Sequence, residues 1–478
     1  MALAAGLGLG DGAGNGHSTN TWDRRQPYCD LRRSCRSTSG VDSDIVRQML
    51  IRDPIHGDVG LSPLEERVLD FPEVQRLRGI KQLGTASLVY PGCVHTRFDH
   101  SLGVNALSKR IISAVRQSGT RVDMEMEQLI GTAALLHDVT HVPFGHTLED
   151  ERCLFPRHDK GARFITLFGG ALGARLEALG VKQPLAALLG IAGETSAAAP
   201  LWARQVIAST IDADLLDYLR RDAYFAGLAA NYDDRIFRYF VVDHDQLVIN
   251  MTKHGMERPD ARSETVQLLR LRYFLTERVY YHHTKVTAGA MISKAVELAQ
   301  EHGAAGEDEL LQLNDWSLFQ RLRQIPSAAR PDARIAGLVE RLETRALLKR
   351  GYVVSALSVA EAGRRALVER FHQSARNRRD AEATLGRELG CDAAEVIVYC
   401  PALTVMKEAA ALVRTPRGVA ALNAVDDESG AEIQALEARY AALWRLYVFV
   451  PDEFAARTAD PARHIFGYPS EHQGRLPH

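Results

Sequence analysis

Cysteine is scarce in this 478-residue sequence, and no two of its six cysteines form a C-x-x-C pair. This scarcity excludes a disulfide framework or a zinc ribbon and favours a reducing compartment. The sequence also lacks a positively charged segment at its N-terminus and an apolar run of the roughly 18 residues that a membrane span requires. We therefore expect a cytoplasmic protein without a signal peptide and with no membrane partner.

An excess of charge of either sign is missing as well. Lys and Arg total 58, Asp and Glu total 60, and the formal net charge is -2. A polycationic nucleic-acid binder would show a basic excess, so the balance argues against nucleic acid as a partner. The composition, 46% hydrophobic and 25% charged, is that of a globular protein. The length fits one large domain or two of moderate size.

Histidine, in contrast, is concentrated in one part of the chain. Seven of the 17 histidines fall within about a fifth of the sequence: His56, His95, His100, His137, His141, His146 and His158. Such clustering indicates a metal site or an acid–base site.

Three regions differ in composition and in the periodicity of their apolar residues. Residues 1–43 are rich in Gly, Ser, Asn and Arg without apolar periodicity, which predicts a flexible tail. Residues 44–345 have a mostly helical pattern, and residues 346–478 alternate β-branched or aromatic runs with helical stretches. The predicted fold class is therefore mainly α, a helical core followed by a smaller C-terminal α+β lobe.

Several individual elements can be placed. Ser62 before Pro63 predicts the start of a helix. Further helices are expected over 127–137, after Thr210 and over 263–299, and strands over 352–354, 396–399 and 446–450. Arginines crowd residues 364–379, but acidic residues alternate with them, so a solvated helix is favoured over a nucleotide or RNA contact.

Ionisable residues follow the most apolar predicted helix. His137 and Asp138 end that helix, and a buried ionisable pair is costly unless it is hydrogen-bonded or holds a metal. Farther along, Asp214, Tyr218 and Asp222 are spaced by four, so on a helix they line one face. The set offers imidazole and carboxylate groups but no thiolate.

In this arrangement the sequence resembles the HD-domain phosphohydrolase superfamily and, within it, the dNTP triphosphohydrolases. Five motifs in the same order carry the resemblance: DPIHG (53–57), QRLRGIKQLG (75–84), PGCVHTRFDHSLGV (91–104), LLHDVTHVPFGH (135–146) and IDADLLDYLRRD (211–222). Weaker similarity continues through 278–285, 343–350 and 396–400. The resemblance implies an HD-domain core over residues 44–345 that splits dNTPs into deoxynucleoside and inorganic triphosphate.

The resemblance also implies a metal site. Its four ligands would be His100, His137, Asp138 and Asp214, which together neutralise a divalent ion. These ligands suit Mn, Fe, Zn, Ni or Co, while Mg would accompany the substrate phosphates. The alternative is a buried polar network without metal.

Catalytic roles follow by the same resemblance. His146 would protonate the leaving 5′-oxygen, with Glu149 or Asp159 orienting a histidine, and His141 and His158 would lie beside the phosphates. The alternative is that these histidines lie outside the reacting centre or at the surface.

The resemblance places further residues around the nucleotide substrate. They are Gln82, Leu83, Arg97, Tyr218, Asp222, Arg272 and Tyr280. Arg97 could instead pair with Asp99 or another acid, Tyr280 could be core packing, and salt bridges along a helix face explain Asp222 and Asp217 equally well.

A nucleotide effector site is implied by Asp70, Gln75, Arg78, Arg345 and Lys349. An exposed amphipathic helix over 73–81 and a solvated basic face explain these residues equally well. Relatives that assemble around effector nucleotides imply a homo-oligomer, a dimer or a tetramer.

The sequence departs from the family pattern at two places. Thr140 and Val142 replace glycines in the histidine loop, which limits close approach of its backbone to phosphate. Leu215 follows Asp214, where relatives often carry a basic residue for the phosphate chain. Two alternatives therefore remain. The protein could be an HD-type phosphatase or phosphodiesterase that hydrolyses another nucleotide, or a non-catalytic nucleotide-sensing protein.

Overall fold

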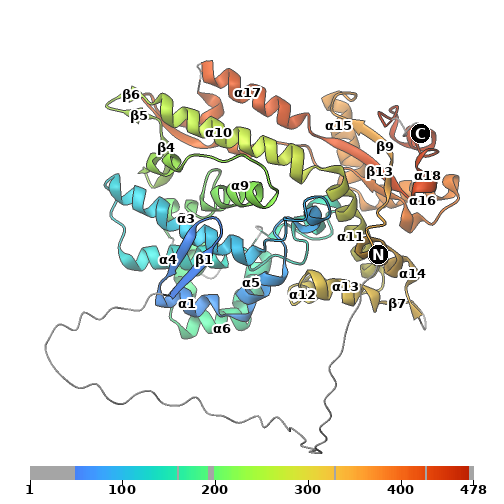
Figure 1. The fold of residues 1–478 in the computed structure, drawn as a ribbon, viewed down its shortest axis with the longest axis horizontal. Helices are drawn as coiled ribbons and strands as arrows, with labels where there is room; N and C mark the ends of the chain where they lie inside the picture. The colour runs from blue at the N-terminus through green and yellow to red at the C-terminus, as the bar shows by residue number, and fades with distance from the viewer. Residues whose placement is uncertain (1–48, 159–160, 192–198, 328–329, 426–427, 473–478) are drawn as a thin grey trace, which may run out of the picture. The chain divides into compact units, whose positions relative to one another are not determined.

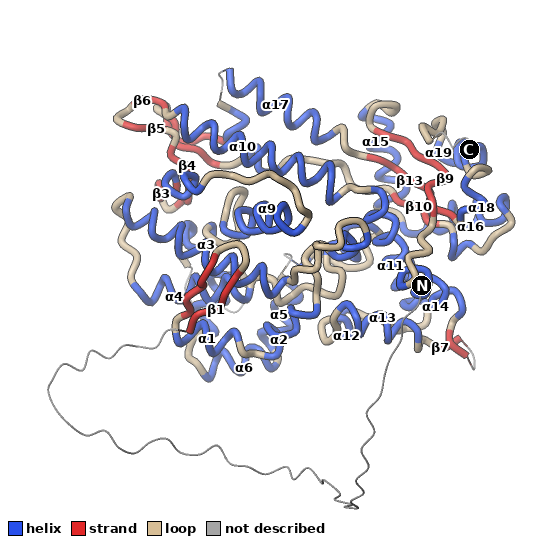
Figure 2. Tube along the Cα trace, in the orientation of Figure 1, coloured by secondary structure: helices blue, strands red, loops and turns tan. Residues whose placement is uncertain are grey.

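The computed structural model describes residues 49–158, 161–191, 199–327, 330–425 and 428–472 (Figure 1). The predicted tail, residues 1–43, and Asp159 lie outside these ranges. Helices dominate the described residues, which confirms the mainly α fold class (Figure 2). The helices are α1 (Pro63–Leu69), α2 (Pro72–Arg76), α3 (Arg97–Gln117), α4 (Met124–Leu136), α5 (Ala162–Gly169), α6 (Ala171–Ala178), α7 (Lys182–Leu189), α8 (Leu201–Gln205), α9 (Ala213–Phe225), α10 (Pro259–Leu275), α11 (His283–Glu301), α12 (Glu307–Leu310), α13 (Asp315–Arg323), α14 (Ala333–Glu343), α15 (Glu361–Leu367), α16 (Ala375–Leu389), α17 (Glu428–Ala441), α18 (Asp452–Ala455) and α19 (Ala459–Phe466).

Helix α3 lies at the centre of the site region and packs against both α4 and α9. Each of these three helices begins at a side chain that accepts a hydrogen bond from the first turn. Thr96 forms a capping box with Asp99 at α3, and Asp123 and Asp212 cap α4 and α9. The helix start predicted at Ser62 is also present, at α1, where Ser62 forms a capping box with Glu65.

The strands form small sheets. Strands β1 (Met49–Asp53) and β2 (Gly57–Leu61) make a hairpin with DPIHG at its turn. A second sheet has the order β12-β11-β4-β3, and in it β11 runs parallel to β4. Its strands are β3 (Phe240–Asp243), β4 (Gln246–Asn250), β11 (Leu412–Thr415) and β12 (Gly418–Ala421). Two short hairpins are β5 (Thr252–Lys253) with β6 (Met256–Glu257), and β7 (Pro326–Ser327) with β8 (Arg330–Pro331).

The three predicted C-terminal strands are present and form one antiparallel sheet of order β10-β13-β9. They are β9 (Lys349–Ser355), β10 (Ile397–Tyr399) and β13 (Arg445–Val450). Helices α16, α18 and α19 pack against this sheet. The domain boundary predicted at residue 345 stays a prediction. Strands from both sides of residue 345 share the β12-β11-β4-β3 sheet.

The helix predicted over 263–299 is wrong as one element. Helix α10 ends at Leu275, a π-helical turn covers Thr276–Tyr280, and His282 caps the new helix α11 by accepting a hydrogen bond from Thr284 N. The break redirects the chain, and α11 is buried along nearly its whole length from Val286 to Ala299.

A buried ion network joins α11 to the C-terminal part. The Arg152 guanidinium donates to both carboxylate oxygens of Glu382 on α16, at 2.8 and 3.1 Å, and also pairs with Glu297 on α11. Lys294 Nζ lies 2.6 Å from Glu382 Oε2. Arg378, predicted to be solvated, is instead buried and donates to the Arg152 carbonyl oxygen at 3.0 Å, because α16 turns this face toward α11.

Among the described residues, no helix is both long and apolar enough to cross a membrane.

Candidate metal centre and histidine cluster

Three helices bring the predicted metal ligands together. His100 comes from α3, His137 and Asp138 follow the end of α4, and Asp214 lies in the first turn of α9. His100 Nε2 is 3.3 Å from His137 Nε2 and 2.9 Å from Asp214 Oδ1. His137 Nε2 is 3.5 Å from Asp138 Oδ1. One ligand atom each from His100, His137 and Asp138 lie within 4.8 Å of one another.

The chemistry of this donor set fits a cation. His137 Nδ1 lies 2.7 Å from the Ala134 carbonyl oxygen, which can only accept, so Nδ1 donates and the neutral ring presents a lone pair at Nε2. His100 Nδ1 likewise lies 2.7 Å from the Asp217 carboxylate. Two imidazole lone pairs therefore face each other and two carboxylates, which is favourable only if a positive charge lies among them.

A proton is the alternative positive charge at this point. Burial lowers the pKa of His100, but hydrogen bonds to Asp214 and Asp217 outweigh it and raise the pKa to about 10. The cluster therefore takes up one positive charge in the absence of any other cation.

Asp217, for which the sequence left a helix-face salt bridge as an equal alternative, orients His100. His56 Nε2 and Arg221 Nη2 lie 2.6 and 2.9 Å from its Oδ1, and Arg221 Nε lies 2.8 Å from its Oδ2. Asp53, in the same turn as His56, accepts from Arg221 Nη1 at 2.8 Å. The DPIHG motif therefore supports the predicted ligand His100 through Asp217, which stands three residues after Asp214 on α9.

Gly103 permits this arrangement. It lies one turn after His100 on α3, facing α9, and a Cβ atom there would be 1.8 Å from Asp217 Oδ1 and 2.4 Å from Arg221 Nη2. Only glycine leaves room for the buried pair between the two helices.

Arg97 pairs with an acid in this structure, namely Asp138 rather than Asp99. Its Nη1 donates to Asp138 Oδ2 at 2.6 Å, and both side chains are buried. On the other side of the same carboxylate, His141 Nε2 lies 3.1 Å from Asp138 Oδ1. Burial lowers the pKa of His141 well below its ordinary value, and Arg97 adds to the effect, so His141 is neutral.

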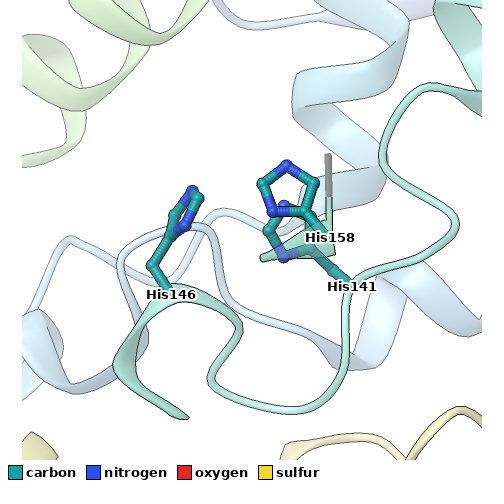
Figure 3. A group of neighbouring side chains, drawn as sticks. All are labelled: His141, His146 and His158. Atoms are coloured by element: carbon teal, nitrogen blue, oxygen red, sulfur yellow. The ribbon is translucent and has the colours of Figure 1, made fainter. Parts of the chain in front are cut away.

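His141, His146 and His158 form a second cluster beside the first (Figure 3). The rings of His141 and His158 have centroids 3.7 Å apart, and His146 lies edge-on to both at about 5 Å. His146 is half exposed, whereas His141 is buried.

Glu149 joins two of these histidines from a π-helical turn, Thr147–Glu151. Its Oε2 lies 3.1 Å from His158 Nδ1 and 3.4 Å from His146 Nδ1. Although burial raises the pKa of Glu149, hydrogen bonds with both histidines hold it well below its usual range. The buried Arg163, absent from the predicted site, donates to Glu149 Oε1 at 2.5 Å.

The residues predicted to contact the triphosphate or the sugar lie on α9, on α10 and in the π-helical turn Thr276–Tyr280. Asp222 accepts from Tyr280 Oη at 2.7 Å and contacts His95 Nε2 at 2.9 Å. The Arg272 guanidinium lies 5.3 Å from the ring centres of both Tyr218 and Tyr280. These contacts bring Tyr218, Asp222, Arg272 and Tyr280 together.

Two protein-family models match consecutive parts of the chain. Residues 97–222 match the family described as HD domain, and residues 234–475, about half of the chain, match the HD associated region. The chain belongs to the HD-domain phosphohydrolase superfamily.

The chain spans about half the length of the curated relatives that it matches. An uncharacterized protein of Bacillus subtilis is 32% identical over 259 residues, which are 53% of this chain and 56% of the relative. The deoxynucleoside triphosphate triphosphohydrolase of Xenopus laevis is 27% identical over 312 residues, 57% of this chain and 48% of that enzyme.

Solved structures share the fold. A phosphohydrolase from Bacteroides thetaiotaomicron superposes with a TM-score of 0.62 at 22% identity, covering 84% of this chain and 99% of that one. A hypothetical protein from Aquifex aeolicus superposes with a TM-score of 0.64 at 21% identity, covering 87% and 100%. Identities this low compare the fold alone.

The HD-domain loop accommodates the two residues that replace glycines of the family pattern. Thr140 and Val142 are fully buried and have negative φ angles, so neither needs glycine. Arg76 holds the loop by donating to the carbonyl oxygens of Val139 and His141 at 2.9 and 2.7 Å. Phe144, with φ +57°, is fixed by its N–H donating to Asp315 Oδ1 at 3.1 Å.

The predicted base-side residues Gln82 and Leu83 precede a 3-10 turn, Gly84–Leu88. The Gln82 N–H donates to the His95 carbonyl oxygen at 3.0 Å, and Leu83 packs on the main core. A Cβ atom at Gly84 would be 3.7 Å from Phe144 and Thr147, so this turn lies against the histidine loop.

The predicted effector residues fall into two groups. Arg78 Nε donates to Gln75 Oε1 at 2.8 Å and its guanidinium covers the Phe98 ring, while exposed Asp70 ends α1. The expected helix over 73–81 is wrong in extent, because α2 ends at Arg76 and a 3-10 turn follows. Arg345 donates to the Leu88 carbonyl oxygen at 3.1 Å, and Lys349 begins β9.

Proposed function

We propose that this HD-domain protein is a metal-dependent nucleotide phosphohydrolase that splits dNTPs into deoxynucleoside and inorganic triphosphate. The observation that carries the proposal is the convergence of His100, His137, Asp138 and Asp214, whose imidazole nitrogens and carboxylate oxygens face one another at 2.9–3.5 Å. A cluster of three histidines lies directly beside this set, through the contact of His141 with Asp138.

The four convergent side chains would hold the metal, which is Mn, Fe, Zn, Ni or Co by the ligand types, with Mg accompanying the phosphates. When bound, such an ion supplies a Lewis acid that neutralises and polarises phosphoryl oxygens. Asp217 and Arg97 keep the ligands His100 and Asp138 oriented, so the site needs little reorganisation when substrate arrives.

His146 is proposed to donate a proton to the departing 5′-oxygen. Burial lowers the pKa of His146, whereas Glu149 and Asp150, at 3.4 and 3.7 Å from its Nδ1, act in the opposite direction and leave Nε2 for the substrate. His141 and His158 lie beside it to contact phosphate oxygens. Tyr218 and Tyr280 offer ring faces to the deoxyribose, and Gln82 and Leu83 lie toward its base.

A second candidate is hydrolysis of a nucleotide phosphomonoester or phosphodiester. It is favoured by Leu215, which is buried beside Asp214 where a basic residue would contact the phosphate chain. A third candidate is a non-catalytic nucleotide sensor, which would bind a nucleotide at the same residues without hydrolysing it.

Product analysis tests the proposal. The protein is incubated with each of the four dNTPs and Mn, and products are identified by mass. We expect inorganic triphosphate and deoxynucleoside, and we expect Asp138→Ala to reduce turnover to the background rate because it removes a ligand and the partner of Arg97. Asp308→Ala, an exposed acid far along the chain, is the matched control. Orthophosphate or pyrophosphate as the product would support the second candidate, and no turnover with any metal would end both.

We also propose that an effector nucleotide drives assembly into a dimer or tetramer, through Asp70, Gln75, Arg78, Arg345 and Lys349. The two groups of residues lie on separate elements, and a nucleotide bridging two copies would use both. We expect the hydrodynamic mass to rise when GTP is added, measured by light scattering after size exclusion. A monomeric mass with and without GTP would contradict this proposal.

A further inference from the structure

An acid from the C-terminal lobe pairs with Arg272, an arginine that the family resemblance places at the nucleotide substrate. Arg272 Nε donates to Glu408 Oε1 at 3.2 Å, from the 3-10 turn Lys407–Ala410. The side chains of Arg272 and Glu408 are only 23% and 10% exposed, so water screens the pair weakly. Glu408 was not predicted from the sequence.

The pair belongs to the proposed substrate pocket. Arg272 lies over Tyr218, which stands one turn after Asp214 on α9, and over Tyr280. Burial raises the pKa of Tyr218, and the charges of Arg272, Glu408 and Asp214 all act on it, as expected if all three lie near its ring.

Two arginines beside the metal ligands and the histidine cluster already have acidic partners. Arg97 pairs with Asp138 and Arg163 pairs with Glu149. Leu215 adds no charge. Of the three acids that pair with Arg97, Arg163 and Arg272, Glu408 is neither a proposed metal ligand nor a partner of the histidines.

We infer that Glu408 is a specificity-determining residue: its carboxylate competes with the terminal phosphates of the substrate for Arg272 and shifts preference toward substrates with a shorter, less charged phosphate chain. The inference rests on the proposed function for the location of the site. A triphosphate would have to displace Glu408 from Arg272, whereas a single phosphate at the metal would leave the pair intact.

Glu408→Gln tests this by removing the charge while keeping an acceptor for Arg272. Binding of inorganic tripolyphosphate and of orthophosphate is measured by calorimetry on the Mn-loaded protein. We expect tripolyphosphate to bind roughly tenfold more tightly than to the wild type, the worth of one charge-assisted contact, and orthophosphate to change less than about twofold. Turnover of dNTPs should show a lower KM with a similar kcat.

The matched control is Glu432→Gln, which removes another acid paired with an arginine of α10, Arg270, in a more exposed pair. It should leave both affinities unchanged. In an Arg272→Gln background, Glu408→Gln should no longer improve tripolyphosphate binding. Circular dichroism checks folding, and Glu408→Asp, which shortens the carboxylate, replaces Gln if the melting temperature falls.

Unchanged tripolyphosphate affinity, or an equal gain for orthophosphate, would overturn the inference. Failure of the proposed function looks different: no variant would turn over dNTPs, while the gain in tripolyphosphate binding would persist.

Discussion

Gly103→Ala is expected to weaken metal binding by roughly 10–100-fold and to lower the free energy of unfolding by about 3–5 kcal/mol. Glycine to alanine inside a helix ordinarily stabilises by about 1 kcal/mol. Here the added methyl group would enter the space of the Asp217 carboxylate and separate it from His100 and Arg221. The steric and electrostatic cost exceeds the helix propensity gain. Metal content by mass spectrometry and chelator competition, with urea unfolding, measure both effects.

Gly337→Ala is the matched control, because it lies inside α14 and a Cβ atom there would meet no atom within 4 Å. It should be neutral or slightly stabilising. If Gly103→Ala does not fold, Asp217→Asn removes the same charge from His100 without adding volume and should still weaken metal binding. Wild-type metal affinity in both variants would contradict this account of His100.

Glu382→Ala is expected to destabilise the protein by about 3–5 kcal/mol, because it leaves buried charges without their partner. Both Arg152 and Lys294 point at this carboxylate, and the Val398 N–H donates to its Oε1 at 3.0 Å. Arg152 directly follows the turn that holds Glu149, so we also expect slower turnover in the folded fraction. Urea unfolding followed by circular dichroism measures the stability.

Glu388→Ala serves as the control on the same helix, since Glu388 is exposed and its loss should change stability by less than about 0.5 kcal/mol. A loss below about 1 kcal/mol for Glu382→Ala would mean that the network contributes little beyond its own desolvation cost.

Local signals predicted the frame of the site. Ser62 and Pro63 predicted the start of α1, the apolar run before His137 predicted α4, and the spacing of Asp214, Tyr218 and Asp222 predicted one helix face. Each of these rests on residues within a turn or two of one another, which is the range over which a sequence pattern constrains the backbone.

Long-range partners could not be predicted in the same way. Glu408 stands in a turn with no motif, and its pairing with Arg272 depends on how the C-terminal lobe packs. Arg378 follows a charge pattern typical of a solvated helix, yet tertiary packing buries it against Arg152. The break near Tyr281 was missed because apolar periodicity continues across it. His56 had a signal, its place in DPIHG, but its partner Asp217 became evident only when α9 was placed.

The parallel pairing of β11 with β4 has a consequence for how the chain folds during synthesis. Strand β4 leaves the ribosome long before β11, and until then its edge toward β11 has no partner. Unpaired apolar edges of this kind associate with other chains. The HD associated region therefore closes with β11 a sheet begun much earlier, so the nascent chain is open to misassembly until β11 has been synthesised.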